Sequence, residues 1–277
     1  MFEMIEILKA ILFGIVEGVT EWLPISSTGH LILLNEFVNL QVSEQFQEMF
    51  DVVIQLGAIL AVIVLFFHKL NPFAPSKSGE EKKQTWSLWA KVILAIIPSG
   101  LVGVLFDDWM DAHLHTSTVV AAMLILYGVA FILVEKAYQG RHTIQDVNAI
   151  DYKTALGIGL FQCLSLIPGT SRSGSTILGG ILLGAGRAAA AEFSFFMAIP
   201  TMLGASAIKL LKFFLSGVGF AGGEVAVLLI GCIVSFLVSL MVIRGLMSYV
   251  RQHSFSVFGV YRIVLGILVL AYFAFVK

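Results

Sequence analysis

Long apolar segments alternate with short polar connections along the whole chain. Six of these segments are long enough to cross a bilayer, because a helical span needs about 20 residues that each rise about 1.5 Å. They are residues 49–67, 88–106, 118–135, 190–208, 224–243 and 257–276. The pattern predicts an all-α polytopic membrane protein with six transmembrane helices.

Two further apolar regions, 5–36 and 154–185, are interrupted in the middle. The interruptions read LPISSTGH and IPGTSRSGST, and the piece after each one is too short to span. Irregular backbone at membrane depth is tolerated only where protein buries it or where it lines a wet cavity. We therefore expect two re-entrant helical hairpins, each with an irregular tip.

The chain also resembles itself at a fixed distance. A shift of 144 positions places Pro24 on Pro168 and Glu48 on Glu192. The expected order is a hairpin followed by three spans in both halves, so an odd number of crossings turns the second half upside down. The sequence predicts one membrane domain over 1–277 with inverted repeats at 1–136 and 150–277, and such folds place their site where the repeats meet.

Basic residues mark one side of the expected topology. Three connections carry an excess of Lys and Arg and are cytoplasmic by the positive-inside rule: Lys69, Lys77, Lys82, Lys83 and Lys91; Lys136, Arg141 and Lys153; Arg244 and Arg251. The opposite connections, 36–48 and 107–117, are acidic, although Lys209 and Lys212 depart from the pattern. The first hairpin and both termini are then expected outside, and the second hairpin in the cytoplasmic half.

Composition agrees with a membrane protein and argues against a nucleic-acid partner. The chain is 58% hydrophobic and only 13% charged, about half the charge of an average soluble domain. Its net charge of −1 offers no basic stripe for a phosphate backbone.

Glu17 and Glu21 are carboxylates within one apolar segment, where a charge costs about 2.5–3.5 kcal/mol on insertion scales. They are four residues apart and share one helix face. Paired carboxylates of this kind are typical ligands of Mg²⁺ or Ca²⁺, and we expect a metal site here. The alternative, two surface glutamates that face water, fits the apolar context poorly.

The first tip gathers hydroxyl groups and an imidazole. Ser26, Ser27 and Thr28 precede His30 at a loop-to-helix junction, a place that suits a phosphate group. One hydroxyl could instead cap the next helix, and His30 could be a core histidine. Gln55, in the first span, is a candidate to line the same cavity.

The second tip is the sharper signal for an anion. Gly169 lets backbone amides approach a ligand, and the following helix start offers free N–H groups. Arg172 adds a planar fork that matches phosphate oxygens. Ser171, Ser173 and Thr176 complete a predicted phosphate site beside the metal site.

The two motifs EGVTEWLPISSTGH and PGTSRSGST together closely resemble those of the undecaprenyl-pyrophosphate phosphatase family, the bacitracin-resistance membrane proteins. The matching positions are Glu17, Glu21, Ser27, His30, Arg172, Ser173 and Thr176. The resemblance covers essentially the whole chain, and no motif position departs from it.

This resemblance implies hydrolysis of a polyprenyl diphosphate carrier lipid to its monophosphate, with Mg²⁺ or Ca²⁺ as cofactor. The product would be recycled for peptidoglycan and other wall polymers, and less diphosphate would remain for bacitracin to sequester. It also implies a multi-pass protein of the cell membrane, surrounded by lipid, with a site that we expect to open to the outer face. The sequence leaves a homodimer open.

Several mechanisms are compatible with the residues. Ser27 is the preferred nucleophile, with His30 as general base or acid, Glu17 and Glu21 on the metal, and Arg172 on the phosphate. His30 as nucleophile and a metal-activated water are the alternatives. A transporter or flippase of polyprenyl phosphate or of a small anion is the competing function, because transporters also use inverted repeats.

Overall fold

The computed structural model describes residues 2–114, 116–138 and 140–275, which form helices and their connections without any β-strand. The α-helices are α1 (Phe2–Thr20), α2 (Ser27–Phe37), α3 (Glu44–Val53), α4 (Gln55–Leu65), α5 (Phe67–Leu70), α6 (Gly79–Leu114), α7 (Ser117–Tyr138), α8 (Tyr152–Cys163), α9 (Arg172–Leu182), α10 (Arg187–Leu215), α11 (Glu224–Val250) and α12 (Ser256–Phe275). Two short 3₁₀ turns, η1 (Val147–Ala149) and η2 (Leu164–Leu166), flank α8. The all-α prediction is confirmed.

All six predicted spans are helical in the structure. Six stretches of the described residues are long and apolar enough to cross a membrane: Glu44–Leu65, Gly79–Phe106, Ser117–Tyr138, Arg187–Leu215, Glu224–Val250 and Ser256–Phe275. Each overlaps one predicted segment. The first is bent where Ile54 separates α3 from α4, which places Gln55 at the start of α4.

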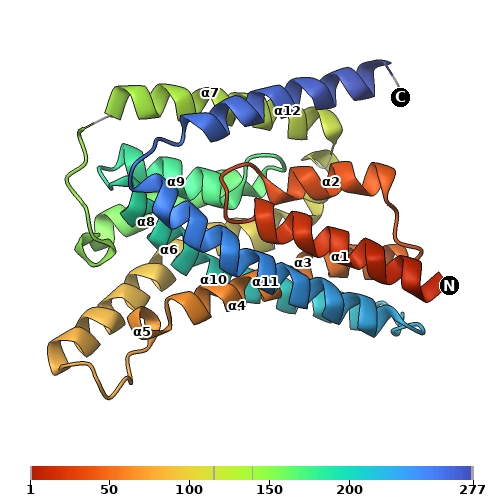
Figure 1. Cartoon of the computed structure of the whole chain (residues 1–277), viewed down its shortest axis with the longest axis horizontal. Helices are drawn as coiled ribbons and strands as arrows, with labels where there is room; N and C mark the ends of the chain where they lie inside the picture. Colours follow the sequence, from red (N-terminus) through yellow and green to blue (C-terminus); the bar gives the residue numbers. More distant parts are fainter. Residues whose placement is uncertain (1, 115, 139, 276–277) are drawn as a thin grey trace.

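The two interrupted regions form the helix pairs α1–α2 and α8–α9. Figure 1 shows that the connection between α1 and α2 and the connection between α8 and α9 both lie in the middle of the molecule. The first pair extends toward the end of the molecule that holds both termini, and the second extends toward the opposite end. Their re-entry into a bilayer from opposite sides stays a prediction.

Packing between the halves is reciprocal, as an inverted repeat would require. Helix α1 packs along α11, α8 packs along α6, and α7 packs along α12. Small residues permit the close approach: a side chain on Gly128 of α7 would meet the carbonyl oxygen of Gly259 in α12 at 2.7 Å. Small-residue faces had left a homodimer open, but these two glycines are occupied by contacts within the chain.

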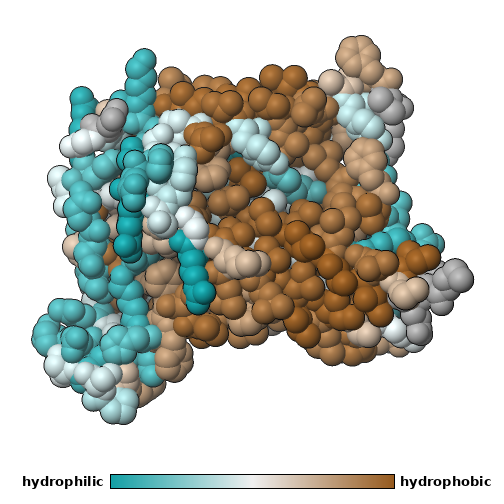
Figure 2. Space-filling model, in the orientation of Figure 1, coloured by the Kyte–Doolittle hydropathy of each residue, from teal (hydrophilic) through white to brown (hydrophobic). Residues whose placement is uncertain are grey.

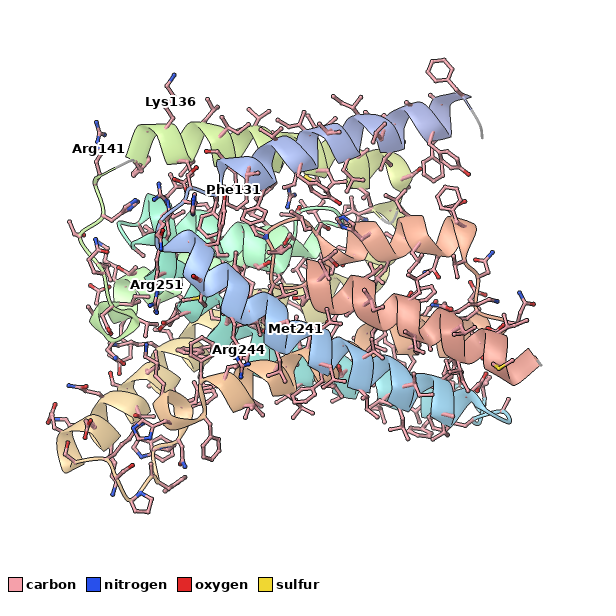
Figure 3. The ribbon with its side chains drawn as sticks, viewed as in Figure 1. Phe131, Lys136, Arg141, Met241, Arg244 and Arg251 are labelled. Atoms are coloured by element: carbon pink, nitrogen blue, oxygen red, sulfur yellow. The ribbon has the colours of Figure 1, made fainter. Side chains whose placement is uncertain are left out.

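Polar and basic residues gather at one end of the molecule. Figure 2 shows a hydrophilic band at the left and a broad apolar surface across the middle. Figure 3 places Lys136, Arg141 and Arg251 at that polar end, opposite the termini. These three basic residues therefore lie at one end, whereas Arg244, which was also predicted to lie in a connection, is inside α11 and nearer the middle. The assignment of the polar end to the cytoplasm stays a prediction.

Candidate functional site

The two tips end in matching helix starts. Ser26 precedes α2 with φ 74°, and Ser171 precedes α9 with φ 75°; they are the only non-glycine residues with positive φ in the described chain. Each hydroxyl accepts a hydrogen bond from the backbone N–H three residues later, Gly29 at 3.2 Å and Gly174 at 3.1 Å. The two caps are 145 positions apart (171 − 26), whereas the two prolines are 144 positions apart. The second tip therefore has one more residue between its proline and its cap than the first.

Glu21 joins the two tips at the centre of the site. Its Oε2 accepts a hydrogen bond from the Ser27 hydroxyl at 2.5 Å, and its Oε1 accepts one from Arg172 Nη2 at 3.0 Å. The carboxylate is 5% exposed. Because charge-assisted hydrogen bonds strengthen in a water-poor setting, one carboxylate orients both the candidate nucleophile and the candidate phosphate-binding guanidinium.

Buried neighbours hold Arg172 in place. Its Nη1 donates to the carbonyl oxygen of Ser194 at 2.8 Å, and its guanidinium lies over the ring of Trp22, 5.8 Å from the centroid. Thr176 shares a 2.7 Å hydrogen bond with the Ser194 hydroxyl. Ser194 was missed by the sequence analysis, because one serine inside an apolar helix carries no local signal.

A cavity of about 170 Å³ opens where the tips meet. Its lining includes most of the predicted substrate and catalytic residues: Glu21, Ser27, Thr28, Gln55, Gly169, Ser171 and Arg172. Ser165 and Thr201 also line it and were not predicted. The polar part of the lining therefore consists of hydroxyl groups, one amide, one carboxylate and one guanidinium, which suits a phosphate-sized anion, and Pro168, Met202 and Ala205 form its apolar part.

Three predicted substrate ligands instead use their hydroxyl groups within the protein. Ser26 caps α2, Ser173 donates to the carbonyl oxygen of Glu21 at 3.1 Å, and Thr176 bonds to Ser194 and donates to the Arg172 carbonyl oxygen at 2.9 Å. None of the three lines the cavity. In this structure they fix the tips, and their assignment to the substrate stays a prediction.

His30 is also placed differently from the prediction. Its Nδ1 lies 2.7 Å from the Ser26 carbonyl oxygen and its Nε2 lies 2.7 Å from the Tyr261 hydroxyl. A carbonyl oxygen only accepts, so Nδ1 carries a proton, and a neutral ring would accept from the Tyr261 hydroxyl at Nε2. The Ser27 hydroxyl is hydrogen-bonded to Glu21 and not to His30, so the predicted role of His30 as general base or acid has no contact with Ser27 to support it.

Glu17 is a buried carboxylate beside the site. Its side chain is fully buried, and neither carboxylate oxygen has a hydrogen-bond partner among the described residues. An unpaired buried carboxylate is costly, and it lies one helical turn before Glu21. No three His, Cys, Asp or Glu side chains in the described ranges cluster as a metal site, and Glu17 does not itself line the cavity described above. Mg²⁺ is commonly held by one or two carboxylates together with substrate phosphates.

Comparison with known proteins identifies the family. Residues 10–268 match the family described as bacitracin resistance protein BacA. A relative from Enterococcus faecalis named undecaprenyl-diphosphatase is 60% identical over 271 residues, 97% of either chain. Relatives with the same name from Lactiplantibacillus plantarum and Streptococcus thermophilus are each 58% identical, over 99% and 97% of this chain and 100% and 94% of their own. The chain therefore belongs to the BacA family of bacitracin resistance proteins.

Proposed function

We propose that this chain is a membrane phosphatase that hydrolyses undecaprenyl diphosphate to undecaprenyl phosphate and inorganic phosphate. The observation that carries the proposal is the contact of Glu21 with both Ser27 and Arg172, at a cavity formed by two tips. The relatives named undecaprenyl-diphosphatase support the same reaction. The enzyme recycles the lipid carrier for cell-wall synthesis and thereby confers bacitracin resistance.

Ser27 is the proposed nucleophile. Its hydroxyl oxygen attacks the terminal phosphorus, its proton passes to Glu21, and the bond from that phosphorus to the bridging oxygen breaks. Undecaprenyl phosphate leaves with the bridging oxygen, and water then hydrolyses the phosphoserine to release inorganic phosphate. Glu21 replaces His30 as the proton acceptor because it is the group that holds the Ser27 hydroxyl.

Arg172 stabilises the phosphoryl group during transfer. The bonds to Glu21 and Ser194 fix the guanidinium at the cavity, so its charge is already oriented when negative charge develops on the phosphate oxygens. Thr28, Gln55, Ser171 and the backbone at Gly169 are the remaining proposed substrate contacts.

Glu17 and Glu21 would hold Mg²⁺ or Ca²⁺ together with diphosphate oxygens. The bound cation would neutralise phosphate charge and favour departure of the leaving group. The support for this proposal is the pair of unpartnered, buried oxygens on Glu17.

The headgroup and the prenyl chain of the substrate are proposed to lie in different surroundings. About 170 Å³ accommodates a phosphate headgroup but not a long prenyl chain, which would remain among the lipid tails. We further propose that the protein lies in the cell membrane and that the site opens to the outer face, because the basic residues gather at the end opposite the termini.

Phosphate release in detergent tests the function. Purified protein with undecaprenyl diphosphate and Mg²⁺ is expected to release inorganic phosphate without any membrane gradient. A transporter would instead be inactive in detergent and would move lipid phosphate or a small anion across vesicles. Neither the site geometry nor the names of the relatives supports that alternative.

A further inference from the structure

Arg262 is a fully buried cation in the middle of α12. No carboxylate forms an ion pair with it among the described residues. A buried charge without compensation is costly, so the dipoles around the guanidinium must compensate its charge in place of a carboxylate. The residues that supply these dipoles indicate the role of Arg262.

The guanidinium bonds to the backbone of both tips. Its Nη1 donates to the carbonyl oxygen of Pro24 at 2.9 Å, and its Nη2 donates to the carbonyl oxygens of Gly169 at 2.8 Å and Thr170 at 2.9 Å. Pro24 precedes the cap of α2 by two residues, and Thr170 directly precedes the cap of α9. One side chain therefore fixes both tips immediately before the helices that carry Ser27 and Arg172.

Helix α7 completes the surroundings of this side chain. The guanidinium lies over the ring of Tyr127, 5.6 Å from the centroid, and Nη2 is 3.4 Å from the carbonyl oxygen of Met123. In Figure 1, α7 and α12 lie side by side next to α2 and α9. Arg262 thus connects the tips to the α7–α12 pair, which lies outside the cavity.

The next residue toward the N-terminus strengthens the connection to the first tip. Tyr261 bonds to His30 of α2 at 2.7 Å, with the two rings parallel and 5.7 Å apart. Two consecutive residues of α12 therefore contact α2 and the tips, and neither lines the cavity.

We propose that Arg262 is a positioning residue that sets the spacing of the two tips, so that Ser27 and Arg172 act on one diphosphate. This inference rests on the proposed function. A guanidinium suits the task because its two arms reach carbonyl groups on separate tips, whereas a lysine ammonium places all its donors on one atom. Arg262 does not line the cavity where the tips meet, so its effect on the reaction is indirect.

Arg262→Lys tests the proposal, because it keeps the charge and removes one arm. We expect kcat to fall about 100-fold, the effect of roughly a 1 Å misplacement of reacting groups. KM should change less than about threefold, since Arg172 still binds the headgroup. Arg262→Gln, which removes the charge as well, should lower kcat further. Both kinetic constants are measured on the monodisperse fraction from size-exclusion chromatography.

Arg187→Lys is the matched control. Arg187 donates to Glu135 with both Nε and Nη2 at 2.6–3.0 Å, and Glu135 accepts from the backbone of Phe255. This partly buried cation joins α7, α10 and the connection before α12 without touching either tip. The control should lower the thermal unfolding temperature while kcat stays within about threefold of the wild type.

The outcomes separate the two proposals. A selective loss of kcat in Arg262→Lys supports the positioning role. The inference is overturned if that variant keeps kcat within about threefold, if both lysine variants lose kcat in step with thermal stability, or if neither Arg262 variant folds. Wild-type protein that releases no phosphate would contradict the proposed function itself.

Discussion

At the scale of single residues, Glu21 has two tasks that depend on its two oxygens. One oxygen receives the Ser27 hydroxyl and the other holds Arg172. The sequence predicted that these residues meet, because charge inside apolar segments has to find a partner. It did not predict that Glu21 rather than His30 would hold Ser27, since that choice depends on the ring contacts of His30 with Ser26 and Tyr261.

Glu21→Gln should therefore lower kcat by at least about 100-fold, because it removes the proton acceptor. It should also weaken the dependence of the rate on Mg²⁺. Initial rates over a range of Mg²⁺ concentrations check both effects. Glu48→Gln is the control, because Glu48 is exposed and pairs only loosely with Lys209 at 3.6 Å. An unchanged metal dependence in Glu21→Gln would exclude Glu21 from the cation site.

Arg172→Ala should reduce turnover by about 100- to 1,000-fold, the usual effect of removing a donor that stabilises a developing oxyanion. The protein should still elute as a monodisperse peak, because Ser173 keeps its bond to the first tip. Phosphate release measured in detergent checks the rate. Near-normal turnover would remove the second tip from the site.

At the scale of elements, the sequence predicted the location of the two tips well but did not predict their backbone conformation. The runs of proline, glycine and serine showed where the two apolar regions are interrupted. The backbone conformation of the caps was not predictable, because positive φ at a serine is unusual and depends on the fold around it. Ser26 and Ser171 have nearly the same φ, 74° and 75°, as corresponding positions of a repeat would have, and the inverted repeat itself stays a prediction.

Replacement of Ser26 separates conformation from capping. Ser26→Ala should destabilise the protein by about 1 kcal/mol or more, because it removes the cap and keeps a side chain at positive φ. Ser26→Gly should cost only a few tenths of a kcal/mol, roughly, since glycine adopts positive φ freely and is tolerated at this position. Thermal unfolding in detergent ranks the two variants. The reverse order would show that φ at Ser26 carries no strain.

At the scale of the whole molecule, the six spans were predictable because length and apolarity are local properties of the sequence. The sequence predicted two related halves, but it did not predict that α1 packs on α11 and α8 on α6. The particular contacts could not be predicted, because they depend on which small residues face each other.

Gly128→Leu tests that packing. Its side chain would meet the Gly259 carbonyl oxygen and push α7 away from α12, which should cost about 1–3 kcal/mol as overpacking does. Gly100→Leu is the control, since nothing lies within 4 Å of its added carbon. Equal thermal unfolding temperatures for both variants would contradict the close α7–α12 contact.

A double-mutant cycle tests the central claim that Glu21 and Arg172 serve one headgroup from two tips. The rates of Glu21→Gln, Arg172→Lys and the double variant are compared with the wild type for release of phosphate from undecaprenyl diphosphate. Because residues that act as a unit are strongly non-additive, the double variant should be about as slow as the slower single variant. Two losses that multiply independently would contradict a shared site.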